Sequence, residues 1–139
     1  MSQGPESRFW NTLKSSMPPK SFAQRVENRA GGGVPDVFGT LSGLPFWAEL
    51  KATKISTIKI APHQVAWHTS FWAHGGISFF LINALSFKEI RIIEGREAVN
   101  VAQNPRIADH GRVFGSKVEV WDALRADCVA HYAGLMRKV

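Results

Sequence analysis

Residues 33–53 read GVPDVFGTLSGLPFWAELKAT, and they contain the clearest pattern of secondary structure in the chain. Both halves of the stretch are rich in the β-branched and aromatic residues that favour strands, and Ser42-Gly43 between them suits a tight turn. We therefore expect two strands, over residues 34–41 and 44–53, that pair antiparallel as a hairpin.

Three charged side chains stand at positions that this hairpin would bring together. Side chains alternate along a strand, so Glu49 and Lys51 share one face while Leu50 points into the core. Antiparallel pairing places Asp36 alongside Glu49. Two neighbouring carboxylates repel each other unless a cation lies between them, and hard oxygen ligands of this kind suit Mg²⁺ or Mn²⁺. A lysine on the same face can orient a water or stabilise charge on a phosphate, so the pattern indicates phosphodiester hydrolysis.

The flanking sequence predicts further strands and helices on both sides of the hairpin. Pro62 suits the first turn of a helix that Gly75-Gly76 ends, and the apolar run 77–85 is typical of a strand buried on both faces. The other expected elements are helices over 5–16, 97–103 and 121–139, strands over 21–29 and 88–95, a strand or connecting loop over 55–60, and a loop over 103–117. This order predicts an α/β fold with a central mixed β-sheet flanked by helices.

Length and composition indicate one folded domain over residues 1–139. The chain is 45% hydrophobic and 11% aromatic, which excludes a disordered or collagen-like chain. Its one cysteine, Cys128, excludes a disulfide framework and is expected to be a buried structural thiol. No apolar run approaches the ~18 residues of a membrane helix, and the first residues do not resemble a signal peptide. We therefore expect an intracellular protein with no membrane partner.

The charge distribution favours a polyanionic partner. The net charge is +6, and no acidic residue lies between Glu49 and Glu89, a stretch with four lysines and three histidines. A phosphate backbone can lie along such a surface without like-charge repulsion. Nucleic acid is therefore the expected partner, and chance depletion of acids in a hydrophobic segment is the alternative.

The same residues resemble the motif of the PD-(D/E)XK nuclease superfamily. Pro35-Asp36 matches the first half of that motif, and Glu49-Leu50-Lys51 matches the second. A GxPD strand, an ELK strand and a helix that opens with a P-x-Q turn, here Pro62-His63-Gln64, follow in the order of small VRR-NUC and Holliday-junction-resolvase-like nucleases of phages and bacteria. The resemblance covers residues 25–82 and implies a restriction-endonuclease-like core.

The resemblance also implies a role for each motif residue. Asp36, Glu49 and the Leu50 carbonyl would ligate the metal, Mg²⁺ or Mn²⁺. Lys51 would orient the nucleophilic water or stabilise the pentavalent phosphorane. Gln64 would face the site from the start of its helix.

A further metal ligand and the DNA contacts are left with alternatives. The superfamily often supplies another acid from its first helix, where Glu6 is the positional match and is favoured here, although Glu27 lies closer in sequence. On a strand over 21–29, Glu27 shares a face with two arginines, which either form ion pairs with it or contact phosphates. The residues expected to bind DNA are Arg25, Arg29, Lys54, Lys59 and His63.

The predicted helix 62–76 carries three histidines and three large aromatic residues. The histidines are five and six residues apart, which fits no zinc pattern, so we expect them to face DNA or to follow an amphipathic helix. Trp67, Phe71 and Trp72 have helical spacing and are expected in the core, with base stacking as the alternative.

These observations together predict a metal-dependent DNA endonuclease, with branched DNA such as a four-way junction as the expected substrate. Symmetric cutting of two strands requires a homodimer. Apolar residues of the C-terminal helix would build that interface or complete the core; they are Trp121, Leu124, Tyr132 and Leu135. A nuclease for flaps or single-stranded ends and a DNA-binding module with little activity are the alternatives. The resemblance implies a cytoplasmic location, in a bacterial cell or a phage-infected host.

Overall fold

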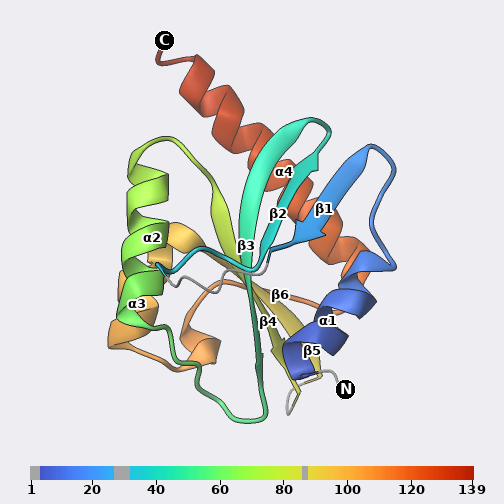
Figure 1. Cartoon of the computed structure of the whole chain (residues 1–139), viewed down its shortest axis with the longest axis vertical. Helices are drawn as coiled ribbons and strands as arrows, with labels where there is room; N and C mark the ends of the chain where they lie inside the picture. The colour runs from blue at the N-terminus through green and yellow to red at the C-terminus, as the bar shows by residue number, and fades with distance from the viewer. Residues whose placement is uncertain (1–3, 27–31, 86–87) are drawn as a thin grey trace.

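The computed structural model describes residues 4–26, 32–85 and 88–139, and a mixed β-sheet lies at its centre (Figure 1). Across the sheet the strands follow chain order: β1 (Ser21–Arg25), β2 (Val37–Leu41), β3 (Leu44–Thr53), β4 (Ser78–Ala84), β5 (Glu89–Glu94) and β6 (Arg112–Phe114). Strands β3 and β4 are parallel, whereas the other described neighbours are antiparallel. The predicted α/β class with a mixed sheet is confirmed.

The hairpin of β2 and β3 forms in the register that its turn residues require. Leu41 pairs with Leu44 and Val37 pairs with Ala48. The two turn residues, Ser42 and Gly43, have φ values of 52° and 82°. Two consecutive left-handed residues make the turn that matches the twist of the flanking strands, so the predicted hairpin is confirmed.

Helices cover both faces of the sheet. They are α1 (Pro5–Lys14), α2 (Pro62–Ala73), α3 (Ala98–Gln103) and α4 (Lys117–Met136), with short 3-10 helices at Gly95–Glu97 and Ile107–Asp109. Figure 1 shows α1 and α4 on one side of the sheet and α2 and α3 on the other. None of the described helices is long and apolar enough to cross a membrane.

Two apolar clusters hold these layers together, one on each face of the sheet. The larger joins α1, α4 and strands β2 to β5, and the smaller joins β4, β5, α3 and the segment that follows β3. Trp121 and Leu124 of α4 are buried in the larger cluster, and the Trp121 indole donates to the Leu13 carbonyl at 2.8 Å. Tyr132 packs against the same cluster. These residues of α4 therefore complete the core of one chain.

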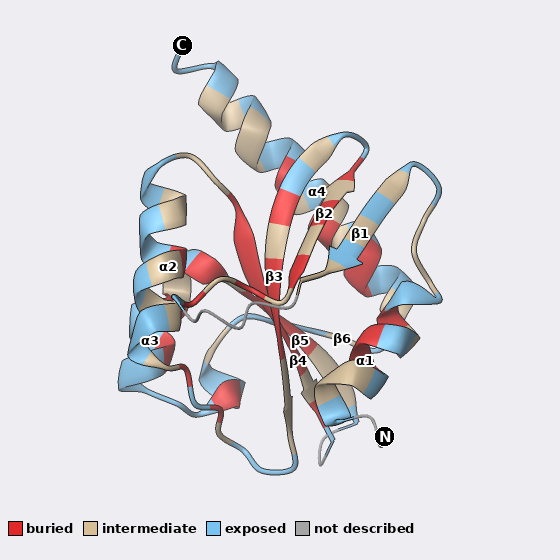
Figure 2. Cartoon of the chain, in the orientation of Figure 1, coloured by how far each residue is buried: buried red, intermediate tan, exposed pale blue. Residues whose placement is uncertain are grey.

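Strand β4 is the buried centre of the sheet, as the apolar run 77–85 predicts. Six of its seven residues are buried, as the red core of Figure 2 shows. It pairs in parallel with β3, with Phe80 opposite Glu49 and Ser78 opposite Trp47. Since α2 connects these two strands, it lies against the face on which Trp47 and Glu49 stand.

The predictions for three segments have different outcomes. Residues 55–60 form the connecting loop, one of the two expected alternatives, with a single isolated bridge from Thr57 to Arg106. The predicted loop 103–117 contains a 3-10 helix and β6. A three-residue strand is too short to show a hydrophobic period, and it exists because β5 pairs with it. The end of the strand predicted over 21–29 lies among residues 27–31, outside the described residues.

Helix α4 starts at Lys117, four residues before the predicted start. Its N-cap is Ser116, whose hydroxyl accepts a hydrogen bond from the Glu119 amide. The sequence Ser116-Lys117-Val118-Glu119 has the spacing of a capping box, so the signal for the true start is present in the chain.

Candidate active site

A cavity of about 400 Å³ collects the motif residues at the junction of α1, the hairpin and α2. Its lining residues are Gly4, Glu6, Ser7, Arg25, Asp36, Glu49, Leu50, Lys51 and Gln64. A larger hollow of about 520 Å³ lies beside the start of α4, but Glu89 is the one acidic residue in its lining. Of these two cavities, only the smaller one therefore brings two carboxyl groups together with a lysine.

Asp36 is positioned by the backbone of the neighbouring strand. The β2–β3 ladder begins at the Val37–Ala48 pair, so the Leu50 amide lies beyond it. The Asp36 Oδ2 atom accepts a hydrogen bond from that amide at 2.9 Å. The Asp36 carboxylate thus accepts from a backbone amide of β3 just beyond the last backbone pair of the ladder. This hydrogen bond holds the carboxylate beside Glu49.

Glu49 is a buried carboxyl group with a second carboxyl group next to it. Its exposed fraction is 3%. Burial, followed by the hydrogen bond and the negative charge of Asp36, raises the pKa of Glu49 to about 9, and the charge of Lys51 only partly opposes this. Without a cation the pair therefore holds a proton at neutral pH, because two adjacent buried negative charges are unfavourable.

The donor set of this pair fits a hard divalent cation. Two carboxyl groups and the Leu50 carbonyl supply oxygen ligands, and Mg²⁺ commonly uses one or two carboxylates and completes its shell with water or substrate. Within the described ranges no three His, Cys, Asp or Glu side chains are grouped closely enough to hold a metal. Among the described residues, a third acidic ligand would therefore require Glu6 to move from its place in the cavity wall.

Gln64 links the first turn of α2 to both charged residues of β3. Its Nε2 atom donates to Glu49 Oε1 at 2.5 Å, and its Oε1 atom accepts from Lys51 Nζ at 3.1 Å. The same Oε1 atom accepts from the Ala61 amide at 3.0 Å. These partners allow one orientation of the amide, because the oxygen faces two donors and the nitrogen faces a carboxyl group. Gln64 therefore holds the Lys51 ammonium beside the carboxyl pair.

The wall opposite α2 comes from α1 and the end of β1. Arg25 Nη1 donates to Ser7 Oγ at 2.7 Å, which ties the strand to the helix. Glu6 lines the cavity beside Ser7, whereas Glu27 lies outside the described residues. The sequence shows no signal for Ser7, because its place in the wall depends on how α1 packs against β3.

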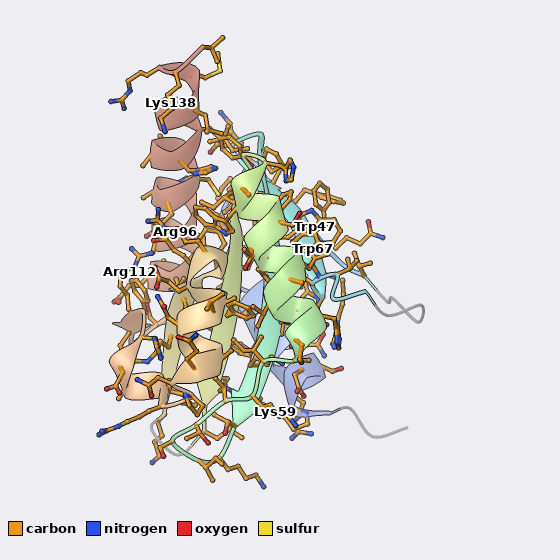
Figure 3. All side chains as sticks on the ribbon, turned by 90° about the vertical axis from the view of Figure 1, so that its left-hand side faces the viewer. Trp47, Lys59, Trp67, Arg96, Arg112 and Lys138 are labelled. Carbon is orange, nitrogen blue, oxygen red and sulfur yellow. The ribbon has the colours of Figure 1, made fainter. Side chains whose placement is uncertain are left out.

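The other residues predicted to bind DNA lie outside the cavity lining. Lys54, Lys59 and His63 are exposed, and Lys59 projects from the segment between β3 and α2 (Figure 3). Arg29 lies outside the described residues. Of the predicted DNA-binding residues, the structure therefore brings Arg25 together with the motif residues.

His68 does not face solvent, so the expectation that it contacts DNA is wrong for this residue. It is fully buried, and its Nδ1 atom is hydrogen bonded to Ser78 Oγ at 2.7 Å. Burial and the charge of Lys51 lower its pKa to about 4. The ring is therefore neutral at physiological pH and packs against Phe80, with the ring centroids 4.3 Å apart.

The aromatic residues of α2 divide between two environments. Trp72 packs against the larger apolar cluster, as expected, and its indole donates to Ser78 Oγ at 3.0 Å. Trp67 and Phe71, which are partly exposed like Trp72, belong to neither apolar cluster and contact each other, with the ring centroids 4.9 Å apart. The expectation of a core position is therefore wrong for these two rings.

Comparison with known proteins identifies similar folds. No protein-family model matches the chain, and no curated protein matches it. A Holliday junction resolvase, Hjc from Archaeoglobus fulgidus, is 14% identical with a TM-score of 0.48, over 64% of this chain and 72% of the resolvase. A structure described as a VRR_NUC domain is 17% identical with a TM-score of 0.44, over 71% of this chain and 95% of that domain. These are the two kinds of nuclease that the motifs resemble.

Proposed function

We propose that residues 1–139 act as one nuclease domain, a metal-dependent endonuclease that hydrolyses phosphodiester bonds in DNA. The observation that carries the proposal is the arrangement of Asp36, Glu49 and Lys51 in one cavity, with Gln64 bonded to the last two. A carboxyl pair beside a fixed cationic donor suits the transfer of a phosphoryl group to water.

Each side chain has a distinct role in this proposal. Asp36, Glu49 and the Leu50 carbonyl would hold Mg²⁺ or Mn²⁺, and Glu49 would release its proton when the ion binds. A bound divalent ion supplies positive charge to the phosphate oxygens and lowers the pKa of water. Lys51 donates a hydrogen bond to the attacking water or to a non-bridging oxygen, where negative charge develops.

The remaining cavity residues would bind the DNA backbone or position Lys51. Arg25 offers a planar, multidentate donor at the opposite wall, which suits a phosphate oxygen pair. Gln64 fixes the Lys51 ammonium and keeps it from folding away from the cavity. Glu6 is proposed as the third acidic group, on the basis of its place in the same wall.

Branched DNA is the proposed substrate, and a homodimer is the proposed assembly. The motif resemblance supports the first, and the need to cut two strands symmetrically supports the second. Trp121 and Leu124 are buried within one chain, so they do not supply an interface. The apolar residues of α4 that are exposed and could contribute to a dimer interface are Val118, Val129 and Met136.

Cleavage of labelled DNA tests the proposal. Four-way junction, flap, single-stranded and linear duplex DNA are incubated with the protein in Mg²⁺ or Mn²⁺, with Glu49→Gln as the inactive control. Paired symmetric nicks in the junction, absent in the variant, are the expected result, and sedimentation would then show a dimer. Cleavage of flaps or single strands alone would keep the active site and discard the junction substrate. Tight binding without cleavage in either metal would contradict the enzyme assignment.

A further inference from the structure

Four partly exposed aromatic rings form a continuous row beside the candidate active site. They are Phe38 of β2, Trp47 of β3, and Trp67 and Phe71 of α2, called the aromatic row below. Successive ring centroids are 5.1, 5.7 and 4.9 Å apart. Figure 3 labels Trp47 and Trp67 next to each other where α2 meets the sheet.

The aromatic row stands on the face of the sheet that carries the catalytic pair. Phe38 is directly opposite Trp47, which precedes Glu49 by two residues and shares its face. Two residues along a strand span about 7 Å. On α2, Trp67 follows Gln64 by three residues, so these two side chains lie on one side of the helix. A ligand that enters the cavity therefore passes the first rings of the row.

The described residues leave the sheet face next to the row open to solvent. Among the described residues, no helix crosses the front of β1 and β2, whereas α4 passes behind them (Figure 1). Phe22 pairs with Thr40 on this open face, and its side chain is 52% exposed. Figure 2 shows the front of β1 mainly as exposed and intermediate residues. An aromatic surface that continues from a cavity onto an open face offers contact area to a ligand longer than the cavity.

A shallow hollow extends the row at its other end. It has a volume of about 220 Å³ and is lined by Trp67, Ser70, Phe71 and His74. This is below the ~300 Å³ at which pockets for drug-sized ligands begin, so the hollow has the size for a single ring system. The rings of the row meet at 53°, 66° and 32°, so they do not cover each other's flat faces as a parallel stack would.

The charges around the aromatic row favour an anionic ligand. Strands β1 and β2 and helix α2 contain no acidic residue, and the one acid of β3 is Glu49. Lys51 lies at the cavity end of the row, and His74 lies at the hollow. Outside the carboxyl pair, the one acidic residue in the described cavity lining is Glu6 of α1. A ligand with flat apolar rings and a negative backbone therefore meets no other acidic residue on the strands and helix that carry the row.

We propose that the aromatic row is a stacking platform for unpaired bases of a DNA strand whose backbone enters the cavity. The inference rests on the proposed function, since the cavity sets the path of the strand. Among branched DNAs it favours those with unpaired nucleotides beside the scissile phosphate, such as a flap, over a fully paired four-way junction. Bases in a duplex stack on each other, whereas unpaired bases present free faces to aromatic side chains. A second copy of the chain is the rival occupant, because aromatic residues are also enriched in protein interfaces.

Binding of two matched oligomers tests the platform without any cleavage. A labelled oligothymidylate and an abasic oligomer of the same length and charge are titrated with the full chain in EDTA, with fluorescence anisotropy as the readout. We expect the oligothymidylate to bind about tenfold more tightly, because stacking on an aromatic side chain contributes that order of affinity per base. Trp67→Leu should remove most of this difference.

Trp72→Leu is the matched control, since Trp72 lies on the same helix but faces Ser78 and the Arg96 guanidinium. It should leave the preference for thymidylate intact. Phe22→Ser changes an exposed ring and opens no core, so it provides a second variant if Trp67→Leu fails to fold. It should weaken the preference by a smaller factor. Circular dichroism and thermal melting check that each variant is folded.

Three results would overturn the inference. The first is equal affinity for the two oligomers, and the second is an unchanged preference for thymidylate in folded Trp67→Leu and Phe22→Ser. The third is a change in sedimentation without a change in DNA affinity, which would assign the face to a second copy. Cleavage in Mg²⁺ is measured separately. If the chain prefers thymidylate but cleaves no DNA, the stacking platform is supported and the proposed nuclease function is contradicted. If the chain cleaves DNA but binds both oligomers with equal affinity, the nuclease function is supported and the platform is contradicted.

Discussion

At the scale of single residues, Glu49 connects the chemistry of the site to the stability of the fold. The metal-free protein holds this carboxyl group in a buried position beside Asp36, with a pKa of about 9 instead of 4.5. Because the folded-state pKa is raised, the stabilising contribution of protonated Glu49 is fully present below about pH 4.5. It is lost as the pH rises towards 9.

Glu49→Gln is therefore expected to change how stability depends on pH. In EDTA the melting temperature of the unmodified protein should fall, relative to that of the variant, between pH 5 and pH 9. At pH 9 the variant should be more stable by on the order of 2 kcal/mol, about 5 °C in Tm. Thermal melts across this range measure the effect, with Glu119→Gln on the exposed start of α4 as the control. A constant difference between variant and parent at all pH values would contradict the buried, protonated state.

Lys51 is predicted to act on the reaction and to contribute little to DNA affinity. Lys51→Met should lower the cleavage rate by about 10²- to 10³-fold, because it removes one donor from the position where charge develops. Its DNA affinity should change by less than tenfold, since one phosphate contact is a small part of a basic surface. Single-turnover rates and anisotropy separate the two effects, with Lys138→Met, at an exposed position after the end of α4, as the control (Figure 3). An equal loss in cleavage rate and DNA affinity would show that Lys51 only binds a phosphate group, which would contradict its role in the reaction.

At the scale of elements, the contact between α2 and the segment before β2 holds the site together. Residues 32–36 run from α2 back to the start of β2 (Figure 1). Gly33 has a φ of +78°, and a Cβ atom there would lie 2.1 Å from the His63 carbonyl oxygen. A glycine at this position thus lets the Asp36 segment approach the helix whose first turn carries Gln64.

Gly33→Ala is expected to destabilise the protein by about 3 kcal/mol and to reduce cleavage. Part of the cost is the left-handed conformation, and the rest is displacement of backbone at the start of α2. Gly32→Ala is a close control, because Gly32 has a φ of +88° but nothing within 4 Å of its Cβ position. It should cost about 1 kcal/mol, the conformational part alone. Denaturant unfolding measures both, and equal losses would show that the close approach is unimportant.

At the scale of the whole molecule, metal binding should appear as added stability. An ion that binds the folded chain alone stabilises it by about 2.7 kcal/mol at a hundred times its dissociation constant. Saturating Mg²⁺ or Mn²⁺ should therefore raise Tm by on the order of 5–10 °C at pH 8. EDTA should reverse the rise. Glu49→Gln should show little of it, and a similar rise in this variant would place the ion elsewhere.

The burial of Cys128 in the core between α4 and the sheet predicts that its thiol reacts slowly. Cys128 is fully buried, and burial followed by the charge of Asp127 raises its pKa to about 12. Thiolate is the reactive form, so the native protein should react with a thiol reagent at least a hundredfold more slowly than the unfolded chain. The expected buried structural thiol is thus consistent with the structure. Rapid labelling of the native chain would indicate that α4 detaches easily.

The fold could be predicted largely from local patterns, because each pattern acts within a few residues. Ser42-Gly43 adopts the turn that its residue types favour, and the apolar run 77–85 forms the central strand. Alternation along a strand placed Glu49 and Lys51 on one face before any tertiary information. Pro62, two residues before Gln64, indicates the first turn of α2. In the structure, Gln64 in that turn is hydrogen bonded to both Glu49 and Lys51.

Other features were decided by packing between distant segments. Strand β6 exists because β5 pairs with it, and no period in three residues could reveal it. The choice of Glu6 for the cavity depends on how α1 packs against the sheet, which sequence distance does not encode. His68 and Trp67 are adjacent in the chain, yet the first is buried and the second is partly exposed.

Local sequence is enough to specify the strand alternation, the turn, the helix starts at Pro5 and Pro62 and the chemistry of the motif residues. These depend on backbone preferences and on side-chain types, which act locally. The burial of Glu49 against Asp36, the hydrogen bond from Lys51 to Gln64 and the position of the aromatic row on an open face arise from tertiary packing alone. Those properties depend on which surfaces of distant elements exclude water together, and burial of that kind is set by the whole chain.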